Sequence, residues 1–305
     1  MSFSPIEIFS KNCRLAGLLV ALPALASAHG GSSVDRKVAA DPKGEVVISN
    51  VSGTVDVRGW DRNEVQVTGH LGDDVERLDV LISGGRTIVK VVLPRGSSND
   101  GDAEIEVLVP MNSTVEVGAV SADVTSRGVL GTQRLKSVSG EITADIAGDD
   151  SEVRSVSGDL TVRGSGKPIS LRVNSVSGSL DLTNGAGKLE IVTVSGGARV
   201  QMGETSEVRG RTTSGDLELR AKLTPDGRVD VEGVSGEITL RLSAPGGLST
   251  EIESFSGDIE GCLAGSVERV SKYGPGTRLN LRTVEGGGAR VRAKTLSGDI
   301  DICDH

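Results

Sequence analysis

Residues 137–142 read Ser-Val-Ser-Gly-Glu-Ile, residues 155–160 read Ser-Val-Ser-Gly-Asp-Leu, and residues 175–180 read Ser-Val-Ser-Gly-Ser-Leu. We call this the repeat phrase and use the residue before its Ser-Gly pair as a marker. Markers stand at positions 138, 156, 176, 194, 213, 234 and 255, which are 18, 20, 18, 19, 21 and 21 residues apart, and another stands at 296. A fixed period of about twenty residues indicates stacked, equivalent units. The motif residues of the clearest copies are Val138, Ser139, Gly140, Val156, Ser157, Gly158, Val176, Ser177, Gly178, Val234, Ser235 and Gly236.

Apolar or small residues fall on every second position after each marker. In residues 138–146 they are Val, Gly, Ile, Ala and Ile, and the residues between them include Glu, Thr and Asp. A period of two indicates a half-buried strand and not a helix. A step of three residues before the marker, as from Val173 to Val176, breaks this alternation and predicts a corner there. We therefore expect Val138, Val156 and Val176 to share one interior column.

One coil is thus two short strands, a corner at the repeat phrase, and a loop rich in Gly, Asp or Pro. Such a unit cannot bury its apolar row alone, so it stacks on copies of itself at the strand spacing of about 4.8 Å. The sequence predicts an all-β parallel β-solenoid with coils of 18–21 residues. Glycine beside the corner indicates a close backbone approach or a positive φ. An antiparallel β-sandwich is the alternative, although sandwiches do not repeat one phrase in register.

The first 28 residues have the pattern of a secretory signal peptide. Lys11 and Arg14 precede an apolar run at 15–25, and Ala-Ser-Ala ends with the predicted cleavage after Ala28. The run is too short to span a bilayer. We expect an exported protein, periplasmic or secreted, with no transmembrane segment in the mature chain.

The rest of the chain divides into three predicted parts. Residues 29–43 are polar and read as a flexible lead-in, and residues 44–117 as a less regular N-terminal β-region that covers the first coil. Residues 118–305 contain the regular repeats. The formal charge of −9 excludes the basic footprint of nucleic-acid binding and disfavours simple docking on anionic lipid.

Two cysteines remain after the predicted cleavage, Cys262 and Cys303. Each lies six residues after the serine of its repeat phrase, and the two markers are 41 residues apart, which is two coils. Two ladder steps place the Cα atoms about 9.6 Å apart, beyond the disulfide limit of about 7 Å. The prediction is two free thiols.

Candidate catalytic groups are few. The histidines are His29, His70 and His305, so a Ser-His-Asp arrangement would depend on His70, and no G-x-S-x-G elbow or zinc motif occurs. The sequence predicts no enzyme, no catalytic residues and no cofactor.

An acidic residue follows the Ser-Gly pair in most coils, and these residues form a row along the stack. These carboxylates either cap the corner backbone and face water or hold a cation such as Ca²⁺. The row comprises Asp123, Glu141, Asp159, Asp216, Glu237, Asp258 and Asp299, and the calcium candidates are Glu141, Asp159, Asp216, Glu237 and Asp258.

These features together resemble a bacterial envelope family of β-strand-repeat proteins, provisionally called adhesins and classed as a domain of unknown function. The resemblance covers nearly the whole mature chain. It rests on residues 44–60 with their Asn-Val-Ser-Gly, on the strand end at Val109 and Pro110, and on the series of repeat phrases. It implies a β-helical body and supplies no catalytic residues.

Three functions compete. The first is a non-catalytic, exported β-solenoid that binds an unknown envelope or surface component, protein or glycan, in an adhesin-like or structural role. The second is a β-helix polysaccharide lyase or hydrolase, which needs clustered carboxylates and usually aromatic sugar platforms, whereas Trp60 and Tyr273 are the only Trp and Tyr. The third, an accessory role in envelope-stress signalling, is suggested only by the family resemblance and by export.

Overall fold

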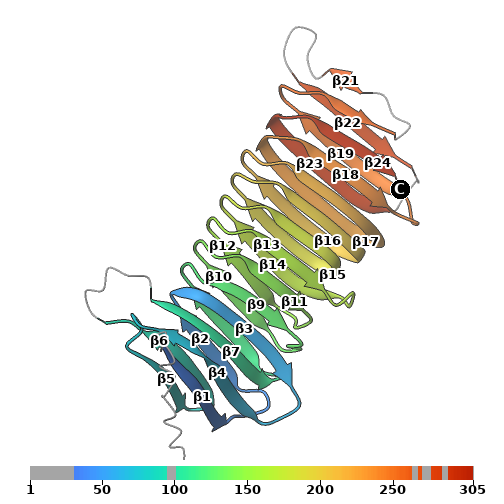
Figure 1. The fold of residues 1–305 in the computed structure, drawn as a ribbon. Coiled ribbons are helices and arrows are strands. Elements are labelled where there is room, and N and C mark those ends of the chain that lie inside the picture. Colours follow the sequence, from blue (N-terminus) through green and yellow to red (C-terminus); the bar gives the residue numbers. More distant parts are fainter. Residues whose placement is uncertain (1–30, 95–100, 263–266, 270–275, 284–287, 305) are drawn as a thin grey trace, which may run out of the picture. The chain divides into compact units, whose positions relative to one another are not determined.

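Twenty-four β-strands joined in one sheet make up the computed structural model, which describes residues 31–94, 101–262, 267–269, 276–283 and 288–304 (Figure 1). These described residues contain no helix, and the predicted all-β class is confirmed. The predicted signal peptide and the cleavage site at Ala28 lie outside the described residues.

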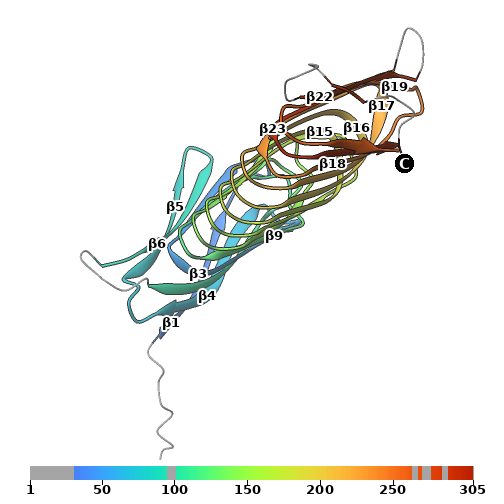
Figure 2. The same ribbon diagram turned by 90° about the horizontal axis from the view of Figure 1, so that it is seen from above.

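Most strands lie in two rows of parallel neighbours, which we call face A and face B, and Figure 2 shows successive coils one behind another. Face A follows the order β6 (Arg86–Val92), β2 (Glu45–Asn50), β8 (Thr114–Ala119), β10 (Gln133–Ser137), β12 (Ser151–Ser155), β14 (Ile169–Ser175), the later parts of β15 (Leu180–Thr193), β16 (Ala198–Thr212) and β17 (Leu217–Ser235), then β23 (Ala289–Ser297) and β19 (Leu248–Ser254). Face B follows the order β7 (Asp102–Pro110), β3 (Ser52–Trp60), β9 (Asp123–Arg127), β11 (Ile142–Ile146), β13 (Leu160–Gly164), the earlier parts of β15, β16 and β17, then β18 (Ile238–Ser243), β24 (Ile300–Asp304) and β20 (Ile259–Gly261).

Equivalent positions of consecutive repeats are ladder neighbours. Ile142 pairs with Leu160, and Leu160 pairs with Leu180, on parallel strands without a shift of register. All three side chains are buried, as are the matching aliphatic residues of face A. Among the described residues the core contains no aromatic side chain, so thin layers of Val, Leu, Ile and Ala are the apolar interior.

The predicted position of the marker residues is wrong. Val138, Val156 and Val176 are stacked but point outward, with 45%, 44% and 44% of their surface exposed. The inward position belongs to the preceding serine, and Ser155 Oγ accepts a hydrogen bond of 2.8 Å from the backbone N–H of Gly158. The same bond forms between residues 137 and 140 and between residues 175 and 178. The corner therefore lies over the Val-Ser pair, because a buried hydroxyl satisfies the turning backbone there.

Close backbone approach explains the glycines of the corner. A Cβ added to Gly158 would lie 2.0 Å from the carbonyl oxygen of Gly140 in the preceding coil, and one added to Gly140 would lie 2.0 Å from that of Ala122. Neither glycine has a positive φ, whereas Gly236 has both a φ of 108° and a close contact. Steric exclusion of any side chain is thus the main reason for Ser-Gly at this place.

Chain order and stack order differ at both ends. The first coil, β2 with β3, lies between the β6–β7 coil and the β8–β9 coil. The last coil, β23 with β24, lies between the β17–β18 coil and the β19–β20 coil. Antiparallel strands lie outside these end coils: β4 (Glu64–Gly72) on β7, β1 (Gly31–Ala39) on β4, β5 (Arg77–Ser83) on β6, β22 (Thr277–Arg282) on β19, and β21 (Glu268–Arg269) on β22. Strand β1 differs from the flexible lead-in expected at 29–43, because it pairs along its length with β4.

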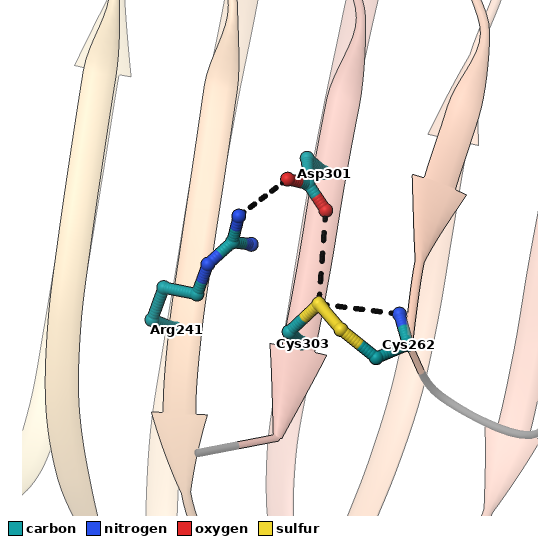
Figure 3. Close-up of a disulfide and its surroundings, with 4 residues drawn as sticks. All are labelled: Arg241, Cys262, Asp301 and Cys303. Carbon is teal, nitrogen blue, oxygen red and sulfur yellow. Dashed lines mark hydrogen bonds and ion pairs between the residues drawn. A yellow bond between two sulfur atoms is a disulfide. The ribbon is translucent and has the colours of Figure 1, made fainter.

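The prediction of free thiols is also wrong. Cys262 and Cys303 form a disulfide with their Cα atoms 4.8 Å apart (Figure 3). Of the strands between them in sequence, β21 and β22 pair antiparallel outside β19, and β23 belongs to the same coil as β24, so β20 and β24 are direct neighbours with Ile259 beside Ile300. A separation of 41 residues therefore spans one ladder step and not two.

Candidate functional site

The acidic row on face B caps the backbone of neighbouring coils. Asp159 Oδ1 accepts hydrogen bonds from the backbone N–H of Ser179 at 2.8 Å and from its hydroxyl at 2.7 Å. The same backbone bond, at 2.9 Å, joins Asp123 to residue 141, Asp216 to residue 237 and Asp299 to residue 258. These aspartates thus stabilise the contact between successive corners, as the first of the two interpretations of the row expects.

Glutamates in the same row bond differently. Among the described residues, the side chains of Glu141 and Glu237 accept hydrogen bonds only from the hydroxyl groups of Thr143 and Thr239 in their own coils, at 3.3 and 3.1 Å. Within the described ranges, no group of three or more His, Cys, Asp or Glu side chains is placed to hold a metal ion. The calcium candidates Glu141, Asp159, Asp216, Glu237 and Asp258 are therefore spread along the stack and not gathered at one point.

The bond between coils makes stability depend on the charge of Asp159. The hydroxyl and the backbone N–H of Ser179 lower the pKa of Asp159 below its ordinary value of 3.8. A lowered pKa in the folded state gives stability that is present above the unfolded pKa and is lost as the pH falls through the folded pKa. We expect Asp159→Asn to reduce the free energy of unfolding by about 0.5–1 kcal/mol at neutral pH. This difference from the native protein should vanish in acid, as measured by urea unfolding.

Glu141→Gln is the matched control for this prediction, because Glu141 occupies the same row without a bond to the next coil. It should leave the pH dependence of stability nearly unchanged. An equal loss in both variants would contradict the capping role of Asp159.

Small residues open a groove in face B. Ser179 and Gly197 interrupt the acidic row, and a Cβ added to Gly197 would meet no atom within 4 Å. The groove has a volume of about 620 Å³ and is lined also by Asp181, Arg199 and Asp216. Hydrogen bonds from Arg199 and Arg220 lower the pKa of Glu218 at its edge, so this polar surface is charged and internally paired.

A charge row of alternating sign runs along face A. Its members are ladder neighbours in stack order: Glu116, Arg134, Glu152, Arg172, Glu190, Arg209, Asp230, Arg292 and Glu251. Ion pairs of 3.5 Å between Arg172 and Glu190 and 3.7 Å between Arg292 and Glu251 belong to it. The alternation holds only because β23 lies between β17 and β19. Opposite charges on facing positions stabilise neighbouring strands, so this row supports the observed order of coils.

Exposed apolar markers form a third surface, which we call the corner ladder. The markers are the rungs of this ladder. Backbone hydrogen bonds at the corners hold successive rungs side by side, as from the N–H of Ser157 to the carbonyl of Val138 at 2.8 Å. One side of the corner ladder is bordered by the acidic row, and the other by outward residues that include Lys136, Arg154, Arg211 and Lys294. The strip is interrupted once, at the polar marker Thr213 between Val194 and Val234, and an apolar strip with a polar rim is typical of an interaction surface. The rungs, 42–55% exposed, are Val120, Val138, Val156, Val176, Val194, Val234, Leu296 and Phe255.

Sequence reasoning missed this surface because it counted the markers as core. The usable signal was the Ser or Thr that precedes most markers, which keeps the period-two alternation with the preceding aliphatic residue, as Leu135 and Ser137 do. His70 lies exposed in β4, beside Ser33 and Glu104 on the flanking strands. The indole N–H of Trp60 donates to the carbonyl of Glu64, and Arg62 covers its ring at 5.0 Å.

No helix within the described ranges is long and apolar enough to cross a membrane.

Solved structures similar to this chain include three that are 11–12% identical to it. A "putative adhesin" from Parabacteroides distasonis is 11% identical with a TM-score of 0.37, and the match covers 90% of this chain and 98% of that one. A "putative lipid binding protein" from the same species is 12% identical with a TM-score of 0.41, covering 88% and 96%. A "putative cell adhesion protein" from Clostridium sporogenes is 12% identical with a TM-score of 0.24, covering 90% and 100%.

A search of curated proteins found no match. The model of a domain family described as Toastrack DUF4097, a domain of unknown function, matches residues 39–303. The match includes every coil of the stack, from the first strand of face A to the disulfide at the C-terminal end. This chain belongs to the Toastrack DUF4097 family.

Proposed function

We propose that this protein is a non-catalytic β-solenoid that binds a component of the bacterial cell envelope through its corner ladder. The observation that carries the proposal is the unbroken line of outward aliphatic side chains, from Val120 to Val194, on consecutive coils. Aliphatic residues exposed by about half of their surface lose hydration on contact with a partner, and each fully buried side chain of this type contributes about 1.5–3 kcal/mol.

Rigidity of the scaffold supports this role. The rungs lie at corners between strands whose inward residues, such as Val153 and Leu160, are fully buried, and backbone bonds hold each corner to the next. A partner therefore meets preorganised side chains and does not have to order them, which lowers the entropic cost of binding. The signal pattern at residues 1–28 supports the further proposal that the protein acts after export, in the periplasm or outside the cell.

Charged substitutions in the corner ladder test the proposal. Val156→Asp with Val176→Asp should weaken retention on sedimented bacterial envelope fractions at least tenfold, about 1.4 kcal/mol, because two rungs then carry charge into the contact. The fold should persist, since both side chains point away from the core. Bound and free protein are measured by quantitative blotting across a dilution series.

Thr161→Asp with Thr183→Asp is the matched control. Both threonines are exposed on face B, in the same coils, and the substitutions add the same charge. This variant should bind like the native protein. Native protein that is not retained, or equal losses in both variants, would overturn the corner ladder as the binding surface.

A further inference from the structure

We propose that Arg228 and Arg290 form a binding site for a phosphate group on face A. They are Cα partners on the neighbouring parallel strands β17 and β23, which places their backbones about 4.8 Å apart. Both side chains are exposed on the same outward row. Like charges on directly facing positions of neighbouring strands are destabilising, so a bound anion between the two arginines would stabilise the pair.

No described residue forms an ion pair with either arginine. Glu207, the ladder neighbour of Arg228 on β16, pairs instead with Arg209 at 2.6 Å and with Lys188 at 3.9 Å. The other basic residues nearby do have carboxylate partners: Arg292 pairs with Glu251, Lys294 with Glu251 and Glu253, and Arg211 with Glu232. The two guanidinium groups thus have no ion-pair partner among the described residues, whereas Arg211, Arg292 and Lys294 nearby each have one.

A groove of about 270 Å³ lies at this pair. Arg228, Arg290 and Arg292 line it together with the hydroxyl-bearing Ser249, and Glu251, which also lines it, forms an ion pair with Arg292. On the far side of Ser249, Arg282 of β22 is its antiparallel partner and also lacks an ion pair within the described residues. Guanidinium groups match the oxygens of phosphate in charge and geometry, and a hydroxyl adds a further donor.

Asp230 in the same groove favours a protonated oxyanion. Its Oδ1 atom is buried and has no hydrogen-bond partner, although Asp230 lies between Arg209 and Arg292 in the charge row. An unpaired buried acceptor can take a hydrogen bond from the P–OH of a phosphate near pH 6, the second pKa of phosphate esters. Sulfate is fully ionised at this pH and has no such proton. The site should therefore distinguish phosphate from sulfate.

Stack order creates this site. Arg228 and Arg290 are far apart in the sequence and meet only because β23 lies between β17 and β19. The source of the phosphate group is either a soluble phosphate ester or a lipid headgroup, since both present the same chemistry to the arginines. The phosphate site is separate from the corner ladder, so an experiment that overturns one of the two proposals leaves the other unaffected.

Calorimetric titration with sodium phosphate tests the proposal on the full chain, at low ionic strength and about pH 6. The native protein should bind phosphate at one site and sulfate at least tenfold more weakly. Arg228→Gln with Arg290→Gln should weaken phosphate binding at least tenfold. The matched control is Arg36→Gln with Arg163→Gln, which removes the same charge from two exposed arginines that are distant in the stack. It should bind phosphate within twofold of the native protein.

A stability measurement distinguishes a site from a merely structural role. In buffer without phosphate, Arg290→Gln should raise the melting temperature, because it removes the repulsion, and phosphate should then no longer raise it further. Phosphate that gives neither heat nor a shift in the melting temperature of the native protein would overturn the proposal, as would equal losses in the control. Sedimentation with phosphatidylcholine vesicles, with and without phosphatidic acid, identifies the source. Retention only on the acidic vesicles supports a lipid phosphate, and retention on neither, with phosphate bound, supports a soluble ester.

Discussion

Gly158→Ala should destabilise the protein by about 3 kcal/mol or more, although it adds one methyl group. The new Cβ would lie 2.0 Å from the carbonyl oxygen of Gly140, and a backbone atom cannot move aside as a flexible side chain can. Relief requires the two coils to separate, which also strains the hydrogen bond from the N–H of Ser157 to the carbonyl of Val138 in the preceding coil. Urea unfolding followed by circular dichroism measures the loss.

Gly197→Ala provides the comparison. Gly197 lies beside the corner of a later coil, its φ is not positive, and an added Cβ would meet no atom within 4 Å. We expect a change within about 0.5 kcal/mol, because a surface substitution of this kind has no clash. A similar large loss in both variants would show that backbone flexibility, and not close approach, explains glycine at these positions.

Removal of the disulfide should have the second large effect. Cys262→Ser with Cys303→Ser should lower the stability of the C-terminal coils by about 4 kcal/mol, from the loss of a cross-link that spans 41 residues. The bond ties β20 to β24, and thus holds the inserted last coil to its outer neighbour. Unfolding in a stack proceeds from its ends, so the loss should appear as early exposure of β19, β20, β23 and β24 in hydrogen exchange.

The native protein with and without reductant provides the control. Reductant should destabilise the native chain to the level of the double serine variant and leave that variant unchanged. Under non-reducing conditions the native mass should be lighter by two hydrogen atoms than under reducing conditions. Thiols that react fully with alkylating reagent before reduction would contradict the bond.

The stacking of the repeats and the all-β fold class could be predicted from the sequence, because both depend on local periodicity. The alternation of Ile142, Ala144 and Ile146 with polar residues indicated strands, and the fixed repeat indicated that Ile142 and Leu160 would be neighbours. Hydrophobic periodicity gave the wrong prediction at the corner. There Ser137 is buried and Val138 is exposed, although valine is usually the more buried of these two residue types. A hydroxyl that bonds the turning backbone is more stable inside than an aliphatic group that leaves the N–H of Gly140 unsatisfied.

The order of coils was not accessible from repeat counting. Counting assumes that each repeat stacks on the one before it, and this assumption fails for β23 and β24. The free thiols predicted for Cys262 and Cys303 followed from that error. Charge could have corrected it, since Asp230, Arg292 and Glu251 alternate in sign only when β23 is placed between β17 and β19. The phosphate site at Arg228 and Arg290 could not be found without this placement.

The place of the β23–β24 coil within the stack affects the order in which the stack can assemble. Strands β19 and β20 are synthesised before β23 and β24, so the position between the β17–β18 coil and the β19–β20 coil is empty until the later strands follow. Early closure of that gap would set Glu251 against Asp230 and Glu253 against Glu232, in each case two negative charges at one rung. The charges on these strands thus disfavour a stack that lacks the β23–β24 coil, in which β19 would lie directly on β17.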